Sequence, residues 1–477
     1  MQQAHYLVVD VGGHGLRALV YDTQGVCQFS QFRAIERLCP APGQVEHNAN
    51  DFVTAMRSAM AELRRILLPE SITPVAAAIT CQRSTVVAWR SEDGTPLSKA
   101  LSWQDVRAAD FMRSFEAHAP WIQRRTGLRL SPHYGAGKIR WIMDHVLPDA
   151  LRETDAWQVG PLASFLMAAT LQSHPRQCDP ANAGRTLLMN CHTACWDVDL
   201  LNLFGVNLAN LPTIVDTCHE FGVFIDWPEL PLKLVTGDQS AAVFGAGCAL
   251  HAGELLINLG TGAFLMTPWE DAQRAESSLE LGLLRSILHK DQERIDYILE
   301  GTVNGAGSAL TWLCELEHCA RAPSYAQVVG VRGQAYFMNG VGGLAAPYWH
   351  PNFKIEFIHA TTSAEKFCAV YDSILFLLYV NYQCFCACVP PLSTVRLSGG
   401  LSQDAALCQA LADLFELPVE LYSDHEATAR GAAWLLAAKP DAWFLQATIC
   451  YQPRSNPSLR ACWEQWQKYM DSRLTRR

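Results

Sequence analysis

Two segments of this chain share one plan, in which a strand, a glycine-rich turn and a second strand follow one another. The first segment runs from Tyr6 to Tyr21 and turns at Gly12-Gly13-His14-Gly15. The second runs from Leu255 to Met266 and turns at Gly260-Thr261-Gly262. Two β-rich runs joined by a glycine turn are typical of a hairpin, and such a turn leaves backbone N–H groups free to approach a phosphate. One such hairpin in each half predicts two related lobes with a cleft between them.

The remainder of the chain alternates strand and helix patterns. Residues 50–67 are expected to form a helix, Val75–Thr80 a buried strand, and Asp404–Phe415 an amphipathic helix. This alternation indicates an α/β protein, and 477 residues favour two domains over one. Because the strand–glycine–strand plan starts again near Glu254, we place the domains at residues 1–248 and 249–477.

Composition argues against several classes of protein. The formal net charge is −10 with no basic run, so a nucleic-acid partner has little support. The longest apolar stretch, Ile374–Val380, is too short to span a bilayer, and the first residues lack the pattern of a secretory signal. Seventeen cysteines without regular spacing are typical of free thiols in a cytoplasmic protein. No Cys-x-x-Cys pair occurs, which argues against a structural zinc site.

A single acid, Asp238, lies between Gly237 and Gln239, ahead of a run of small helix-forming residues. Such an acid suits a general base at the wall of a cleft. It equally suits a residue that caps the following helix, and the local sequence leaves both interpretations open. Because the Gly260 turn follows about twenty residues later, acid and phosphate turn together suggest phosphoryl transfer.

With these elements in place, the chain resembles the FGGY family of carbohydrate kinases, most closely its glycerol kinase branch. The resemblance covers about Tyr6 to Leu436 and depends on the order and spacing of several short motifs. These are Asp10-Val-Gly12 with Arg17, Gln82-Arg83, Trp103-Gln104-Asp105, Lys138-Ile-Arg-Trp141, Asn182-Ala-Gly-Arg-Thr186, Gly237-Asp238-Gln239, Gly260-Thr261-Gly262, Ala346-Pro-Tyr-Trp349, Gly399-Gly400 and Thr428–Ala433. The resemblance implies two actin-like ATPase (ribonuclease H-like) lobes. It also implies ATP with Mg2+ as cofactors, and transfer of the γ-phosphate to a hydroxyl of a small sugar or polyol.

The resemblance also implies functions for individual residues. Asp238 would be the catalytic base and, with Asp10, would hold the metal. The sugar-binding residues would be Gln82, Arg83, Trp103, Asp105, His133 and Gln239. The nucleotide contacts would be Gly12, Gly13, His14, Arg17, Gly260, Thr261, Gly305, Gly399, Gly400 and Asp404. The structural alternatives are ordinary turns for the glycines and core packing for Trp103.

Two departures from the family pattern bear on function. Gly13-His14-Gly15 replaces the hydroxyl-bearing phosphate turn of relatives, which favours an alternative function as a catalytically silent nucleotide- or sugar-binding protein. Ser84 stands where the glycerol kinase branch has Glu, and His133 stands near its Tyr. The shorter Ser84 leaves room for a larger acceptor, so we expect a pentulose such as xylulose to be favoured over glycerol.

Three further patterns have less specific interpretations. Gly135-Ala-Gly-Lys138 resembles part of a P-loop, but Pro132 replaces the first required glycine and Ile139 follows the lysine. Cys384, Cys386 and Cys388 alternate like metal ligands, yet a buried helix is the simpler prediction. A sugar-independent actin-like ATPase is a third possibility, against which the Gln82-Arg83 motif argues. Kinases of this kind are often homodimers, although no interface is apparent in the sequence.

Overall fold

The computed structural model describes residues 4–152, 154–270, 279–422 and 426–475, which form two compact units. The first unit contains the chain up to Ala249 together with two later segments, Arg285–Tyr297 and Glu426–Phe444. The second unit contains the remainder. A single division at residue 248 therefore leaves out two segments that belong with the first unit.

The first unit is built on a six-stranded sheet in the order β13-β14-β5-β1-β2-β3. Its strands are β1 (His5–Val11), β2 (Gly15–Tyr21), β3 (Cys27–Ala34), β5 (Pro74–Cys81), β13 (Cys218–Val223) and β14 (Pro231–Gly237). β1 and β2 form the predicted antiparallel hairpin, whereas β1, β5 and β14 are parallel neighbours. Parallel strands end at the same edge of a sheet, so Asp10, Gln82 and Asp238 are brought to one edge.

Helices pack against the face of the sheet on which its buried apolar residues lie. Alternate residues of β1, such as Leu7 and Val9, are completely buried in the same core as Phe52 and Met56 of α1 (Ala49–Leu67). The two strand residues are two positions apart and the two helix residues are four positions apart. These spacings place side chains on one face of a strand and on one face of a helix. The helix predicted at residues 50–67 and the strand predicted at 75–80 are both confirmed.

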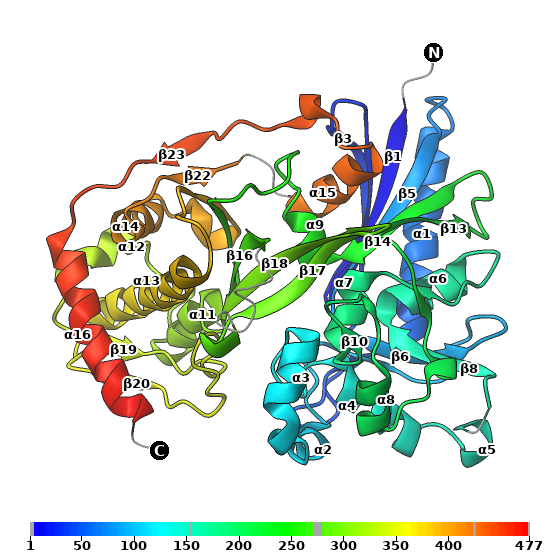
Figure 1. Ribbon diagram of the computed structural model, residues 1–477. Helices are drawn as coiled ribbons and strands as arrows, with labels where there is room; N and C mark the ends of the chain where they lie inside the picture. Colours follow the sequence, from blue (N-terminus) through cyan, green and yellow to red (C-terminus); the bar gives the residue numbers. More distant parts are fainter. Residues whose placement is uncertain (1–3, 153, 271–278, 423–425, 476–477) are drawn as a thin grey trace. The chain divides into compact units, whose positions relative to one another are not determined.

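Helix α15 (Ala427–Leu436) belongs to the first unit although it lies near the end of the chain. It packs on β1, β5 and the short helix α9 (Asp238–Ala242), and it lies beside these elements in Figure 1. The contact with α9 is very close, because a Cβ added to Gly431 would lie 2.0 Å from the carbonyl oxygen of Ala241. A late segment of the sequence thus supports the helix that begins with Asp238.

A smaller four-stranded sheet, in the order β4-β7-β6-β8, extends the first unit. Its strands are β4 (Glu46–His47), β6 (Val86–Arg90), β7 (Ala100–Leu101) and β8 (Trp157–Pro161). The helices of this region include α2 (Ala109–Arg113), α3 (Ala119–Thr126), α4 (Gly135–His145), α6 (Leu162–Thr170), α7 (Pro180–Ala183) and α8 (Val198–Phe204). The loops around β6 and β7 contain most of the predicted sugar-binding residues.

The second unit repeats the local plan of the first. In a sheet of order β17-β18-β16-β15-β21-β22-β23, strand β15 pairs antiparallel with β16 and parallel with β21. The strands of this sheet that lie in the second unit are β15 (Glu254–Leu259), β16 (Ala263–Trp269), β21 (Thr394–Ser398), β22 (Val419–Leu421), β23 (Ile449–Tyr451) and most of β18 (Arg294–Val303). Nearly all of β17 (Leu284–Asp291) and the start of β18 fall within the segment Arg285–Tyr297, which is counted with the first unit. β1 has the same two kinds of neighbour in the first unit. The predicted repetition of a strand–glycine–strand plan is confirmed.

The helices of the second unit gather around the long helix α13 (Ser363–Cys388). They include α11 (Gly307–Leu316), α12 (Tyr325–Val328), α14 (Ala405–Phe415) and α16 (Pro457–Leu474). Every residue of the apolar run Ile374–Val380 is buried within α13, and Cys384, Cys386 and Cys388 form the last turns of that helix. Within the described residues, no helix combines the length and the apolar character needed to cross a membrane.

Candidate active site

Two aspartates mark the sheet edge of the first unit. Asp10 is near the end of β1, and its Oδ1 accepts a hydrogen bond of 2.7 Å from the hydroxyl of Thr80 on β5. Asp238 is the first residue of α9, directly after β14, with Gly237 as the N-cap. Its Oδ1 accepts the Gln239 N–H at 2.7 Å and lies 3.8 Å from Nε of Arg83. The fold thus brings a predicted catalytic acid and a predicted sugar-binding arginine together.

The surroundings of Asp10 are electrostatically unusual. Burial raises the pKa of Asp10 to about 6, against the lowering effect of its hydrogen bond from Thr80. The negative charges of Asp238 and Glu426 raise the pKa of Asp10 further, and Arg17 opposes them. Negative charge is thus concentrated at this edge, where a cation would be attracted.

The turn between β1 and β2 lies against the residues predicted to bind sugar. Gly12 N–H donates to the carbonyl of Gly15 at 2.9 Å, which closes the turn. A Cβ on Gly13 would lie 3.0 Å from Oε1 of Gln82 and 4.0 Å from Nε1 of Trp103. Any larger residue at position 13 would therefore press on the side chain of Gln82. His14, at the tip of the turn, is exposed.

Arg17 pairs with a residue that the sequence did not indicate. Its Nη1 lies 2.8 Å from both carboxylate oxygens of Glu426, the residue before α15. The nucleotide contact predicted for Arg17 remains a prediction, since in this structure its guanidinium holds the start of α15. The two residues are 409 positions apart, so no local pattern could connect them.

Buried amide groups without hydrogen-bond partners lie at the same edge. Gln82 is 3% exposed, and within the described residues neither Nε2 nor Oε1 has a partner. Oε1 of Gln239 is also buried and has no hydrogen-bond partner within the described residues. Because buried polar atoms are nearly always hydrogen-bonded, such atoms at a candidate site indicate a polar ligand. The indole of Trp103, 43% exposed, offers an apolar surface beside them.

Asp105 and His133 differ in accessibility. Asp105 is completely buried, and its carboxylate accepts the Val45 N–H at 2.7 Å and pairs with Arg107 at 2.8 Å. It therefore fixes the loop that carries Trp103 and presents no surface to a sugar. His133 is exposed, and its Nδ1 lies 3.2 Å from the carbonyl oxygen of Trp103.

The glycine turn of the second unit is tied to the start of α11. Gly260 N–H donates to the Gly262 carbonyl at 2.9 Å, and the carbonyl of Thr261 accepts the Ser308 N–H at 2.9 Å. Gly305 is packed more tightly still, since a Cβ there would lie 2.4 Å from Oδ1 of Asn339. These contacts hold the turn rigidly and leave the Thr261 side chain exposed.

The end of β21 combines a crowded glycine with an open one. Gly399 has φ +97°, and a Cβ there would lie 2.5 Å from the carbonyl oxygen of Leu259. A Cβ on Gly400 would meet nothing within 4 Å in the described part of the chain. Asp404 caps α14, accepting from two N–H groups of that helix at 3.1 Å and from Tyr325 N–H at 2.7 Å. Its predicted nucleotide contact remains a prediction.

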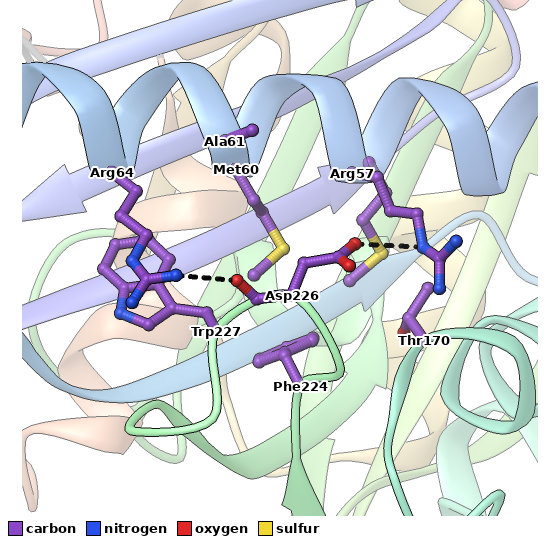
Figure 2. Close-up of a pocket in the computed structure, with 9 residues that line it drawn as sticks. Arg57, Met60, Ala61, Arg64, Thr170, Phe224, Asp226 and Trp227 are labelled. Atoms are coloured by element: carbon purple, nitrogen blue, oxygen red, sulfur yellow. Dashed lines mark hydrogen bonds and ion pairs between the residues drawn. The ribbon is translucent and has the colours of Figure 1, made fainter.

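Among the described residues, neither a cluster of metal-ligating side chains nor the pocket beside α1 provides a second candidate site. In the part of the chain that the structure describes, no three His, Cys, Asp or Glu side chains are grouped as a metal site. Figure 2 shows a pocket beside α1, where Asp226 pairs with Arg57 at 3.1 Å and accepts from Arg64 through its carbonyl. Its volume of about 20 Å³ suffices for a single water.

Comparison with known proteins decides the family. The N-terminal domain of the FGGY family of carbohydrate kinases matches residues 5–245, and the C-terminal domain of that family matches residues 255–439. The chain belongs to the FGGY family of carbohydrate kinases. It is therefore a phosphotransferase with an alcohol group as acceptor, which uses ATP and acts on a sugar or polyol.

Similar proteins agree with this assignment. The glycerol kinase of Dechloromonas aromatica is 33% identical over 460 residues, which are 93% of this chain and 90% of that protein. That of Alcanivorax borkumensis is 31% identical over 452 residues, 90% of this chain and 88% of that protein. Among solved structures, Plasmodium falciparum glycerol kinase with ADP has a TM-score of 0.89 at 23% identity, covering 99% of this chain and 98% of that chain. A ligand-bound xylulose kinase from Lactobacillus acidophilus has a TM-score of 0.84 at 18% identity, covering 98% of each chain. The predicted fold of two actin-like ATPase lobes is confirmed.

Proposed function

We propose that this kinase phosphorylates a pentulose or a four- to five-carbon polyol, with xylulose favoured over glycerol, and that Asp238 is its catalytic base. The observation that carries the proposal is the cluster at the sheet edge of the first unit. There Asp238 lies beside Arg83, and Gln82 has a buried amide without a partner in the described chain.

In the proposed reaction the acceptor hydroxyl oxygen attacks the γ-phosphorus of ATP while the bond to the β,γ-bridging oxygen breaks and ADP leaves. Asp238 accepts the hydroxyl proton. Phosphoryl transfer depends mainly on positioning, so the orientation of the hydroxyl matters as much as the proton transfer. Arg83 serves this orientation in two ways. It donates to acceptor hydroxyls, and its Nε lies close enough to Asp238 to hold the carboxylate in place.

The residues at the sheet edge fit a magnesium ion. Asp10 and Asp238 supply carboxylate oxygens, the ligands that this ion prefers. The pKa of Asp10 is raised mainly by burial and to a smaller extent by the negative charges of Asp238 and Glu426, and a bound cation would oppose both effects. When bound, Mg2+ would neutralise charge on the transferred phosphate. Asp10 and Asp238 are the residues that we propose would hold it.

The preference for a larger acceptor follows from Ser84. A serine is shorter than the Glu of the glycerol kinase branch and lacks its carboxylate, so it would leave room for a larger acceptor. Glycerol, with only three carbons, would fill this room less completely than a pentulose. Kinetics with xylulose and glycerol side by side test the proposal. We expect a higher kcat/KM for xylulose, and a higher value for glycerol would overturn the preference.

A catalytically silent binding protein is the second candidate, favoured by the Gly12-Gly13-His14-Gly15 turn, which lacks hydroxyl groups. ADP release over a panel of sugars separates the candidates when it is combined with thermal shift in ATP and magnesium. Binding without turnover on any sugar would favour the silent protein. Turnover on one sugar would exclude it.

A further inference from the structure

Lys138 is completely buried, yet its ammonium group reaches three backbone carbonyls. Nζ lies 2.9 Å from the carbonyl oxygen of Ser84, 2.6 Å from that of Ser102 and 2.7 Å from that of His133. Each carbonyl belongs to a different loop, and the three loops follow β5, follow β7 and precede α4. An ammonium has three N–H donors, so the number of acceptors matches the number of donors.

Each of these loops carries a residue of the candidate acceptor site. Arg83 precedes Ser84, Trp103 follows Ser102, and His133 supplies both its own carbonyl and its ring. The loops are also linked to one another, since Thr85 Oγ1 accepts the Trp103 N–H at 3.2 Å and the Trp103 carbonyl lies 3.2 Å from His133 Nδ1. The buried lysine lies at the centre of this arrangement.

The backbone at Ser84 shows why such a tie is needed. Its φ is +66°, a left-handed conformation that non-glycine residues adopt at an energetic cost. Tertiary contacts must hold a strained backbone of this kind. The hydrogen bond from Lys138 to the Ser84 carbonyl is such a contact.

The start of α4 is built to bring Lys138 into this position. A Cβ on Gly135 would lie 2.9 Å from Cα of Thr186, and a Cβ on Gly137 would lie 2.9 Å from Cβ of Ala108. Both glycines therefore allow close packing of the helix. The Gly135-Ala-Gly-Lys138 motif, which resembles part of a P-loop, thus has an explanation within the fold. Burial lowers the pKa of Lys138 to about 7, whereas the three carbonyl acceptors favour the charged form.

We infer that Lys138 is a positioning residue for the phosphate acceptor: it holds the three loops that carry Arg83, Trp103 and His133 in one register. This inference rests on the proposed function, because those three side chains are the ones proposed to meet the acceptor. Lys138 itself touches neither acceptor nor nucleotide in this scheme.

The kinetic test uses Lys138→Met, which keeps the length of the side chain and removes its donors. Displacement of acceptor-binding side chains by about 1 Å costs roughly 10²-fold, so we expect a loss of this size in kcat/KM for the acceptor, mainly through a higher KM. The affinity for ADP should stay unchanged. Lys99→Met is the matched control, since it removes an exposed lysine from the same region and should leave KM unchanged. A Lys138→Met enzyme with lower thermal stability but unchanged acceptor KM would overturn the inference in favour of a merely structural function.

Hydrogen–deuterium exchange tests the same tie without catalysis. In Lys138→Met we expect faster exchange in peptides that cover residues 82–86, 101–106 and 131–135, and unchanged exchange in β1 and β2. If the three loops exchange at the same rate in Lys138→Met as in the wild-type protein, the inference is overturned. If wild-type protein phosphorylates no acceptor, the proposed function fails while the exchange result still decides the function of Lys138. If Lys138→Met does not fold, Lys138→Arg takes its place. The planar guanidinium of arginine keeps the positive charge but cannot direct three donors as the ammonium of lysine does.

Discussion

The Asp238 carboxylate tests the proposed chemistry at the scale of one residue. Asp238→Asn keeps the shape of the side chain and removes its ability to accept a proton, so we expect kcat with the preferred acceptor to fall about 10²–10⁴-fold. Steady-state kinetics on folded protein measure the loss. Asp226→Asn is the control, because Asp226 is a half-exposed acid of the same unit that pairs with Arg57 and should leave kcat unchanged. An Asp238→Asn enzyme with full turnover would show that this residue is not the base.

At the scale of elements, the close contact of α15 with α9 predicts an effect of Gly431→Ala on stability that is opposite to the one expected from helix propensity. Glycine within a helix usually costs about 1 kcal/mol relative to alanine, so Gly431→Ala would ordinarily stabilise the protein. Here the added Cβ would lie 2.0 Å from the Ala241 carbonyl, and overpacking of about 1–3 kcal/mol should prevail. We expect a lower free energy of unfolding, measured in urea, and a lower kcat because α9 carries Asp238. Gly330→Ala is the matched control, since a Cβ there meets nothing within 4 Å in the described chain. A stabilised Gly431→Ala would contradict the packing argument.

The elements also show how far sequence could predict this protein. The two hairpins, α1 and the strands beside them were predictable because their patterns are local, and the structure confirms them. The tie from Lys138 was not predictable, because its acceptors are backbone carbonyls of three separate loops, which leave no mark in the sequence. Arg17 and Glu426 are 409 positions apart and meet only because the chain returns to the first unit near its end, so no local pattern could predict their pairing. Trp103 and Asp105 lie two residues apart in one motif, yet one is exposed and the other completely buried, and only tertiary packing decides which.

For the whole molecule, His289 predicts how stability depends on pH. It is 4% exposed, its Nδ1 has no partner within the described residues, and burial, with a smaller effect of Lys439, lowers its pKa to about 4. Unfolded chains take up this proton near pH 6.5, whereas the folded protein takes it up only near pH 4, so acidification through this window favours unfolding. We expect His289 to account for a loss of about 2–3 kcal/mol between pH 7.5 and 4.5.

Comparison with His289→Leu isolates this contribution from that of other groups. The difference in free energy of unfolding between wild type and variant should change over that pH range in favour of the variant. A difference that stays constant with pH would mean that His289 titrates equally in both states.

The return of Glu426–Phe444 to the first unit has a consequence for biosynthesis. A ribosome that has finished the first 249 residues has not yet made α15, so the surfaces of β1, β5 and α9 that this helix covers stay open on the nascent chain. Exposed apolar surface of that kind attracts chaperones and promotes aggregation. The first unit can therefore complete its native packing only when about nine-tenths of the chain has been translated. An isolated N-terminal fragment would end its synthesis without that helix.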